Sequence, residues 1–397
     1  MSCEGGPALS IVPTPEIVSY GALIRRLWGL SDEALIVNHG AYGAAPIEVL
    51  QEQDRFRQMM EAEPTYFMQR ILPAELRRAA EMLADFIFAE PDRLVFVENT
   101  TAGINAILRS LSFGRDDELL LLSHSYGAVR KTADYVAGRC GARTVNVEIP
   151  FPHPDRGVLL SHLDAAIGPL TRLAILDHIT SPSALILPIA EMVRTCHDKG
   201  VLVIVDGAHA PGQVPVDIGR IGADWYVGNC HKWLMAPKGA AFICARRGGP
   251  EIHPTTISHG FGAGLTAEFD WVGTRDWSAC LCIPAAIAFH ARLGGETLMA
   301  RNRELAWCAA THLAERFQTE VAADQEWHGA MSLVRMPMAG DAIPEDALCL
   351  RARLLDQRCD ASFSWINDAV WLRLSSAPYN DLDDFVRLAD ELMALFG

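Results

Sequence analysis

Lysine is scarce in this chain, and basic residues are outnumbered by acidic ones. Only four lysines occur, at positions 131, 199, 232 and 238, and arginine supplies the rest of the 34 basic residues. Asp and Glu number 49, so the formal net charge is −15 at pH 7. Nucleic acids and anionic membranes attract basic surfaces, so this charge excludes both as the main partner. A small-molecule ligand suits the surface better.

Long apolar runs and closely paired cysteines are missing as well. No segment reaches 18 uninterrupted apolar residues, and the opening Met-Ser-Cys-Glu-Gly-Gly lacks the basic region and apolar core of a secretion signal. The ten cysteines are scattered, and the one close pair, Cys280 and Cys282, lacks the CxxC spacing of zinc and redox sites. We therefore expect reduced thiols, no metal site, no membrane association and a cytoplasmic location.

The length of 397 residues, half of them apolar, favours two domains. Residues 1–35 contain prolines and a short amphipathic piece around 17–30, which could be an arm that packs on a partner subunit. The segment 36–274 is expected to form a large domain. The segment 275–397, together with part of the arm, is expected to form a smaller one.

Short apolar runs alternate with helix-length periodic stretches after a helical region at 44–88, where Pro46 and Pro73 are placed to begin helices. The alternation is typical of repeated βα units and predicts an α/β fold with a mostly parallel sheet. We expect its strands at 94–97, 119–122, 144–147, 173–176, 201–205, 225–228 and 240–244. A helix is expected at 188–199. The change of pattern beyond about Thr274 predicts an α+β unit with strands at 332–336, 361–366 and 369–374, a helix at 343–358 and a last helix capped by Asn380.

An aspartate and a lysine stand at places suited to a carbonyl cofactor. Asp206 follows the apolar run 201–205, at the end of a predicted strand where ligands of open α/β sheets bind. Lys232 lies shortly beyond it. Enzymes that use pyridoxal 5′-phosphate (PLP) need an amine to form a Schiff base and a carboxylate to hold the ring nitrogen protonated. Alternatively, Asp206 caps a helix or forms an Asp-Gly turn.

Hydroxyl residues follow the first predicted strand, where Thr100 and Thr101 stand at the expected start of a helix. Amide N–H groups and two hydroxyls at a helix N-terminus can bind a phosphate dianion. Taken alone, the segment is more typical of a well-capped helix.

Three further side chains follow predicted strands on the same edge of the sheet. Tyr126 could offer a flat face to a pyridine ring, or its ring could simply be buried with the hydroxyl in solvent. His209 could bond the cofactor or lie behind Asp206, and His231 could reach a phosphate, although a single histidine is more often a packed polar residue. Near the C-terminus, Arg373 lies on an apolar strand and could bind a substrate carboxylate, or be an exposed edge charge.

Taken together, three segments resemble the class V aminotransferase family of PLP-dependent enzymes with fold type I: 205–212, 228–233 and 371–380. Their order and spacing match from about Asn38 to the end of the chain. Within the family, 38–43 and 271–276 resemble the isopenicillin N epimerase branch. That branch also contains hercynylcysteine sulfoxide lyase and enzymes of antibiotic biosynthesis that process cysteine S-conjugates.

The resemblance implies a large domain with a mostly parallel seven-stranded sheet, a smaller C-terminal α+β domain and a homodimer that shares its active sites. It also implies roles for individual residues. Catalysis and cofactor binding would fall to Lys232, Asp206, Tyr126, Ser181, His209, Thr100, Thr101 and His231, with Thr274 reaching the phosphate of the neighbouring subunit. Arg373 would bind the α-carboxylate of an amino-acid substrate, with Asn38, His39 and Tyr42 nearby.

Two positions depart from related enzymes. Ser181 stands where an asparagine is common, so a contact from this shorter side chain to the cofactor hydroxyl is doubtful. Cysteine desulfurases of the family carry a reactive cysteine on a mobile loop, whereas Cys359 directly precedes a predicted strand. We interpret Cys359 as a structural residue.

Several reactions can follow once PLP has activated the α-carbon of an amino acid. The resemblance favours a carbon-sulfur β-lyase, or related processing of a cysteine S-conjugate in specialised metabolism such as antibiotic biosynthesis. Epimerisation is the alternative and needs a second acid on the opposite face, for which His39 and Tyr42 are candidates. Transamination, decarboxylating deamination and a non-catalytic binding role remain open.

Overall fold

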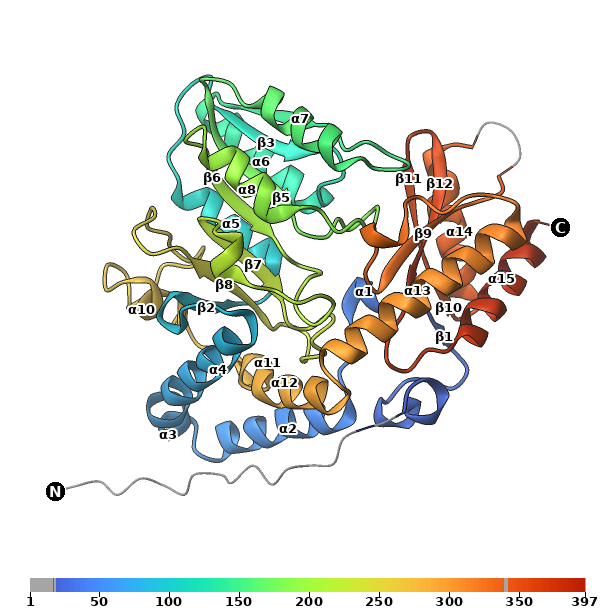
Figure 1. Ribbon diagram of the computed structural model, residues 1–397. Coiled ribbons are helices and arrows are strands. Elements are labelled where there is room, and N and C mark those ends of the chain that lie inside the picture. Colours follow the sequence, from blue (N-terminus) through green and yellow to red (C-terminus); the bar gives the residue numbers. More distant parts are fainter. Residues whose placement is uncertain (1–16, 18, 339–341, 397) are drawn as a thin grey trace.

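The computed structural model describes residue 17, residues 19–338 and residues 342–396 (Figure 1). A large sheet with helices on both faces occupies one side of the molecule. A smaller, mostly antiparallel sheet with its own helices occupies the other, and the long helix α13 (Glu296–Phe317) runs between them (Figure 1).

The large sheet has seven strands in the order β2-β8-β7-β6-β5-β3-β4. β8 runs antiparallel to both of its neighbours, and the other pairs are parallel. The strands are β2 (Leu94–Val97), β3 (Glu118–Leu122), β4 (Arg143–Val147), β5 (Thr171–Asp177), β6 (Leu202–Asp206), β7 (Trp225–Asn229) and β8 (Ala241–Ala245). All seven predicted strands are therefore confirmed, with bounds that differ by at most two residues.

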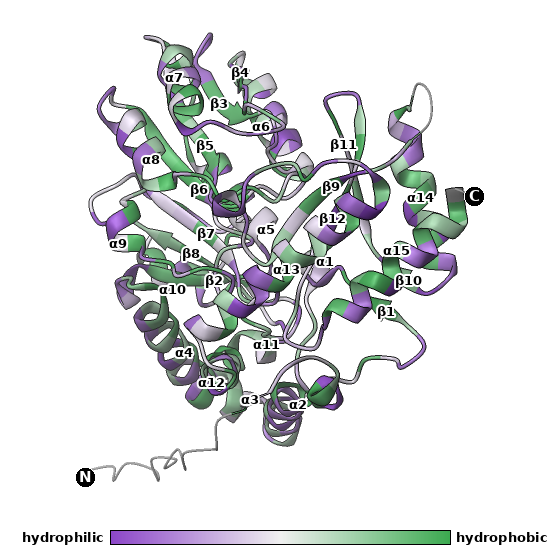
Figure 2. Ribbon diagram, turned by 45° about the vertical axis from the view of Figure 1, so that its right-hand side comes forward, coloured by the Kyte–Doolittle hydropathy of each residue, from purple (hydrophilic) through white to green (hydrophobic). Residues whose placement is uncertain are grey.

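Both faces of this sheet are covered, which explains why its strands are apolar throughout (Figure 2). Neighbouring residues of one strand point to opposite faces: Val95 packs with α5 (Thr100–Ser110) and α6 (Gly127–Cys140), while Phe96 packs with α4 (Leu72–Ile87). The core that contains Phe96 and α4 also receives side chains from five other helices. They are α2 (Ile47–Ala62), α7 (Arg156–Ala166), α8 (Ile189–His197), α9 (Ile218–Ile221) and α12 (Ile283–Arg292). α10 (Leu265–Phe269) packs against β2 and belongs to the same core as α5 and α6.

The smaller unit is built on the antiparallel sheet β11-β12-β9. Its strands are β9 (Met331–Arg335), β11 (Ser362–Ile366) and β12 (Ala369–Ser375), and α13, α14 (Pro344–Asp356) and α15 (Leu382–Phe396) pack on one face. Alternate residues of β12 divide between the faces: Leu372 and Leu374 enter this core, whereas Arg373 faces the large sheet. The predicted α+β pattern is thus present.

The N-terminal segment joins both units. β1 (Leu35–Ile36) pairs in parallel with β10 (Cys359–Asp360) of the smaller unit, and the side chains of Ile24 and Trp28 are buried in the larger core. The arm predicted at 1–35 falls partly outside the described residues. Its described part forms the short 3-10 turns Gly21–Leu23 and Arg25–Leu27 and packs on its own chain.

The predicted division at 274/275 precedes residues of the larger core. Side chains from Trp277 to Leu298, including those of α11 (Ser278–Leu281), pack in the same core as α2 and α4. The core of the smaller unit receives Leu35 and Val37 and then resumes in the second half of α13. Its buried surface is therefore assembled from both ends of the chain.

The starts of three helices were predicted from single residues of the sequence, and two of these predictions are confirmed. Pro46 directly precedes α2, and Pro73 lies in the first turn of α4, as predicted. The prediction that Asn380 caps the last helix is wrong. α15 begins at Leu382, and the Asn380 side chain instead accepts a hydrogen bond from the Ala377 amide (3.0 Å) and donates to the Ile36 carbonyl (2.9 Å).

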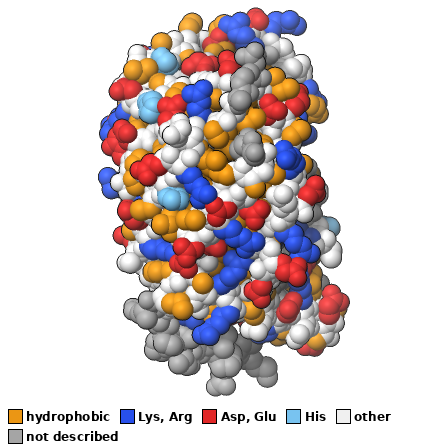
Figure 3. Space-filling view, turned by 90° about the vertical axis from the view of Figure 1, so that its right-hand side faces the viewer, with side chains coloured by type: hydrophobic (Ala, Val, Ile, Leu, Met, Phe, Trp, Pro, Cys, Tyr) orange, Lys and Arg blue, Asp and Glu red, His pale blue; other side chains and the backbone are white. Residues whose placement is uncertain are grey.

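The remaining short helices are α1 (His39–Tyr42), α3 (Pro64–Tyr66), the π-helical turn Phe67–Ile71, and the 3-10 turns Pro91–Arg93 and Gln325–Trp327. Within the described ranges no single helix has the length and apolar content to cross a membrane, although the bent pair Ser278–Arg292 and Glu296–Phe317 meets that criterion together. The face in Figure 3 intersperses acidic and basic side chains.

Candidate active site

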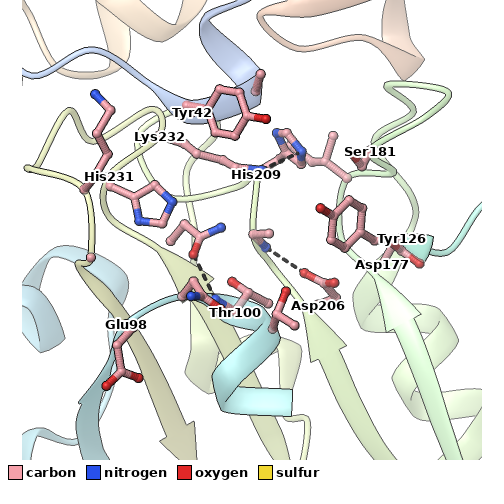
Figure 4. Close-up of a pocket in the computed structure, with 18 residues that line it drawn as sticks. Tyr42, Glu98, Thr100, Tyr126, Asp177, Ser181, Asp206, His209, His231 and Lys232 are labelled. Carbon is pink, nitrogen blue, oxygen red and sulfur yellow. Dashed lines mark hydrogen bonds between the residues drawn. The ribbon is translucent and has the colours of Figure 1, made fainter. Parts of the chain in front are cut away.

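A cavity of about 540 Å³ opens at the carboxyl ends of the central parallel strands (Figure 4). Residues that follow β2, β3, β5, β6 and β7 converge on it, as expected at this edge of an α/β sheet. It is lined by Ala41, Tyr42, Glu98, Asn99, Thr100, Thr101, Tyr126, Asp177, Ile179, Ser181, Asp206, Ala208, His209, Asn229, His231, Lys232, Lys238 and Gly239. Nine of the thirteen residues predicted for the site are among them.

The Lys232 amine is held against an imidazole. Its Nζ lies 3.0 Å from Nε2 of His209, and the Trp233 indole N–H donates to the other ring nitrogen, Nδ1 (3.4 Å). Because an indole N–H only donates, Nδ1 accepts, and the proton of a neutral His209 is on Nε2. Nε2–H then donates to the lone pair of a neutral Lys232 amine. Burial and the positive charge of Arg373 lower the pKa of Lys232 to about 7, in agreement with this arrangement.

Two carboxyl groups stand side by side at the floor of the cavity. Asp206 and Asp177 are direct partners in the parallel pair β6 and β5, and both are buried. Asp206 accepts from the Ala208 amide (3.0 Å), and Asp177 accepts from the Ser125 hydroxyl (2.9 Å). Burial raises the pKa of both, and the charge of Asp206 raises the pKa of Asp177 further. Asp206 is therefore the one that ionises when a cation lies against it, while Asp177 keeps its proton.

The N-terminus of α5 forms another wall. Asn99 caps the helix by accepting from the Ala102 amide (2.9 Å), and Asn229 Oδ1 accepts from the Thr100 amide (3.0 Å). The Thr100 hydroxyl is buried without a hydrogen-bond partner. A phosphate oxygen placed there would satisfy it and would gain from the positive end of the helix dipole.

His231 and Lys238 also border this wall. His231 Nδ1 lies 3.0 Å from the Ala240 carbonyl and therefore donates to it, which leaves Nε2 without a proton. Burial lowers the pKa of His231 to about 4, so His231 would bind phosphate as a donor only if the dianion raised that pKa again. Lys238 is exposed and donates to the Gly43 carbonyl (3.2 Å).

Arg373 defines a second chamber next to the first. Its Nη1 donates to the Ser181 carbonyl (2.7 Å) and hydroxyl (3.3 Å), and its Nη2 donates to Asn38 Oδ1 (3.1 Å). Asn38 is anchored in turn, because its Nδ2 donates to Asp360 (3.0 Å). Arg373 is buried and still lines the chamber, where its fork can receive a carboxylate. Ser181 thus positions Arg373 as well as lining the main cavity.

The predicted contact of His39 with a substrate is not what the structure shows. His39 is buried and lines neither chamber. Its Nε2 lies 3.0 Å from the Lys232 carbonyl and must donate to it, so Nδ1 accepts from the Tyr379 hydroxyl (2.9 Å). His39 therefore holds the backbone of Lys232 in place. Tyr42 does line both chambers and is largely exposed.

The loop before α2 supports the same lysine segment. Gly43 has φ +70°, and a Cβ built there would lie 1.9 Å from the His231 carbonyl. Only glycine permits this approach, because the position combines a left-handed backbone with backbone contact.

Other predicted residues fall elsewhere. Thr274 lies outside both chambers of its own chain. Cys359 is buried in β10, and burial raises the pKa of its thiol to about 12, so it has neither the exposure nor the ionisation of a reactive cysteine. The residues not anticipated were Asp177, Asn229 and Lys238. Asp177 could have been suspected because it ends an apolar strand just as Asp206 does.

The walls together fit PLP. An amine, a buried carboxyl beyond it, a partly exposed tyrosine ring and an unsatisfied hydroxyl at a helix N-terminus stand around one cavity. Lys232 would hold the aldehyde carbon, Asp206 the ring nitrogen and Thr100 the phosphate. No group of three or more His, Cys, Asp or Glu side chains in the described part of the chain is arranged to hold a metal ion.

Comparisons with known proteins agree with this site. Residues 41–388 match the family Aminotransferase class-V. The chain is 35% identical to an isopenicillin N epimerase of Streptomyces clavuligerus, with 91% of this chain and 94% of the relative covered. It is 33% identical to a putative L-cysteine desulfhydrase 1 of Oryza sativa subsp. japonica, with 90% and 82% covered.

A solved structure with the same fold is a cystine C-S lyase in complex with its reaction product cysteine persulfide. Its TM-score is 0.75, the identity is 21%, and the match covers 91% of this chain and 97% of that one. The matches extend over nearly the whole length of each protein. The chain is therefore a PLP-dependent enzyme of fold type I and belongs to the class V aminotransferase family.

Proposed function

We propose that the enzyme is a carbon-sulfur β-lyase that acts on cysteine or a cysteine S-conjugate and releases a thiol, pyruvate and ammonia. The observation that carries the proposal is the position of His39, one of the two candidate second acids. One neutral amine, Lys232, stands over the site, and the candidate second acid His39 lies outside the pocket with both ring nitrogens bonded. β-Elimination needs one base at Cα, whereas epimerisation needs a second acid on the opposite face.

The residues divide the work as follows. Bound PLP supplies an electron sink that lowers the cost of removing the α-proton. Arg373 would hold the α-carboxylate in its fork and so orient the Cα–H bond toward Lys232. Asp206, with Asp177 protonated beside it, would place a single negative charge against the ring nitrogen. Tyr126 would cover one face of the ring.

Lys232 would move the proton. Its neutral amine takes the proton from Cα, the Cβ–S bond breaks and the sulfur leaves with the electron pair of that bond. The leaving thiolate takes up a proton, and the remaining aminoacrylate reacts with water to give pyruvate and ammonia. His209 would keep the freed amine neutral and oriented while substrate is bound, because its Nε2–H donates to the lone pair of that amine.

Epimerisation is the second candidate, and one observation favours it. Tyr42 of α1 lines both chambers, so its hydroxyl is a candidate for the second acid that epimerisation needs. The family match to an isopenicillin N epimerase supports the same alternative.

We further propose that the enzyme is a cytoplasmic homodimer with a role in specialised metabolism. A homodimer is supported by Thr274, which lies outside the pocket of its own chain and would contact a neighbour's phosphate. A cytoplasmic location is supported by nine described cysteines that are all unpaired. A role in specialised metabolism such as antibiotic biosynthesis is supported by the relative from Streptomyces clavuligerus.

The test is product analysis in deuterium oxide with purified holoenzyme and with Lys232→Ala as a control. L-Cysteine and an S-conjugate are supplied, and mass spectrometry and chirality of the recovered amino acid are measured. Stoichiometric thiol (hydrogen sulfide from cysteine) and pyruvate support the lyase. Recovered amino acid with deuterium at Cα, inverted configuration and no pyruvate decides for the epimerase and overturns the proposal.

A further inference from the structure

The chamber around Arg373 has a second guanidinium. It measures about 330 Å³ and is lined by Lys232, Arg373 and Arg351 of α14. No aspartate or glutamate lines it. In a protein whose net charge is −15, a chamber with three basic side chains and no acid is an exception that needs a ligand.

Arg351 has no structural task that accounts for its position. It is half-buried, and within the described residues it makes neither a salt bridge nor a side-chain hydrogen bond, whereas most arginines of this chain do. Its charge acts on Arg373: burial is the main cause that lowers the pKa of Arg373 to about 10, and Arg351 is the second. Two like charges are held in one chamber, which is unfavourable unless an anion comes between them.

Two hydroxyls complete the wall beside Arg351. β11 is the edge strand next to β12, with Ser362 directly opposite Arg373 and Ser364 two residues along on the same face. Both serines are half-buried and line the chamber. Serine hydroxyls and a guanidinium form a polar surface that can bind carboxylate or sulfonate oxygens.

We propose that Arg351, Ser362 and Ser364 form a second anion subsite, which selects substrates whose side chain, beyond the sulfur, carries an acidic group. Arg373 would take the α-carboxylate and Arg351 the distal acid. The substrate class would be cysteine S-conjugates with a carboxylate or sulfonate on the sulfur substituent. This naming of the class rests on the proposed lyase function, whereas the subsite itself does not require that reaction.

The experiment compares two ligands of equal size. S-(Carboxymethyl)-L-cysteine and S-(carbamoylmethyl)-L-cysteine differ only in the charge of the distal group. Dissociation constants are measured with the holoenzyme from the change in cofactor absorbance during titration, which needs no turnover, and pyruvate is measured separately. The variants are Arg351→Gln and Arg353→Gln. Arg353 is exposed on the same helix outside the chamber, so its variant is matched for helix and charge.

Wild type and Arg353→Gln should bind the acid about tenfold or more tightly than the amide, as expected for one charge-assisted contact. Arg351→Gln should remove that preference through weaker binding of the acid, with the amide unchanged within about twofold. Equal weakening of both ligands would show that Arg351 serves the shared α-carboxylate, and no weakening would show that it binds neither; each result overturns the subsite.

Failure of the subsite and failure of the lyase proposal are separable. A charge preference in binding that depends on Arg351, with no pyruvate from either ligand, leaves the subsite standing and removes the lyase. Pyruvate released equally well from acid and amide, with equal binding, does the reverse.

Discussion

The Lys232 amine lies 3.0 Å from His209 Nε2, and the Trp233 indole holds the opposite nitrogen of that ring. The protein thus fixes the His209 tautomer that donates a hydrogen bond to the Lys232 amine rather than accepting one from it. Together with burial, which lowers the pKa of Lys232 to about 7, this makes Lys232 a reactive amine at neutral pH.

The first prediction is a pH profile of PLP uptake by cofactor-free protein. Lys232 is protonated below about pH 7, so the uptake rate should fall about tenfold per unit below that pH and level off above it. Stopped-flow absorbance at several pH values measures the rate, with Lys238→Ala as the control that keeps the profile. A rate that keeps rising to pH 10 would show an ordinary lysine.

The second prediction concerns the paired carboxyl groups. Asp206→Asn should lower turnover by about two to three orders of magnitude, because the charge against the cofactor ring is lost. Asp177→Asn should cost less than about tenfold, because an amide resembles the protonated acid that Asp177 is expected to be. Steady-state kinetics and the cofactor spectrum check both variants. Equal losses would mean that Asp177 carries the charge.

The third prediction tests the fork of Arg373. Arg373→Lys keeps a positive charge but cannot bond the Ser181 carbonyl, Asn38 and a carboxylate together, so KM should rise by about ten- to a hundredfold with a smaller change in kcat. Arg335→Lys, on the neighbouring strand β9 and exposed, is the matched control. If kcat falls and KM stays, Arg373 acts in a later step.

The fourth prediction removes the cysteine that a desulfurase would need. Cys359→Ala should keep activity within about twofold, because the thiol is buried away from both chambers. The cavity left in the smaller core should lower the free energy of unfolding by about 1 kcal/mol. Activity and urea unfolding are measured beside the exposed Cys349→Ala. Loss of activity with intact folding would make Cys359 a catalytic nucleophile.

Sequence patterns determined those features that depend on neighbours in the chain. Five apolar residues before Asp206 specify a strand that is buried on both faces, and the strand's end places the carboxyl at the binding edge of the sheet. The helix start at Thr100 follows in the same way from the strand before it. The spacing of the motifs then predicted Lys232 as the cofactor lysine and indicated the family.

Tertiary structure alone decided which distant groups meet. His39 belongs to the motif 38–43, which predicted a contact with substrate. In the fold, both of its ring nitrogens are instead hydrogen-bonded, one to the Lys232 carbonyl and one to the Tyr379 hydroxyl. Asp177 acquires its meaning only because β5 lies next to β6 in register. Arg351 and Arg373 are 22 positions apart on different elements, and their shared chamber exists because β11 pairs beside β12 and α14 packs against β11. Local patterns set element types through short-range sterics and burial, whereas charge and hydrogen bonding across elements depend on the packed arrangement.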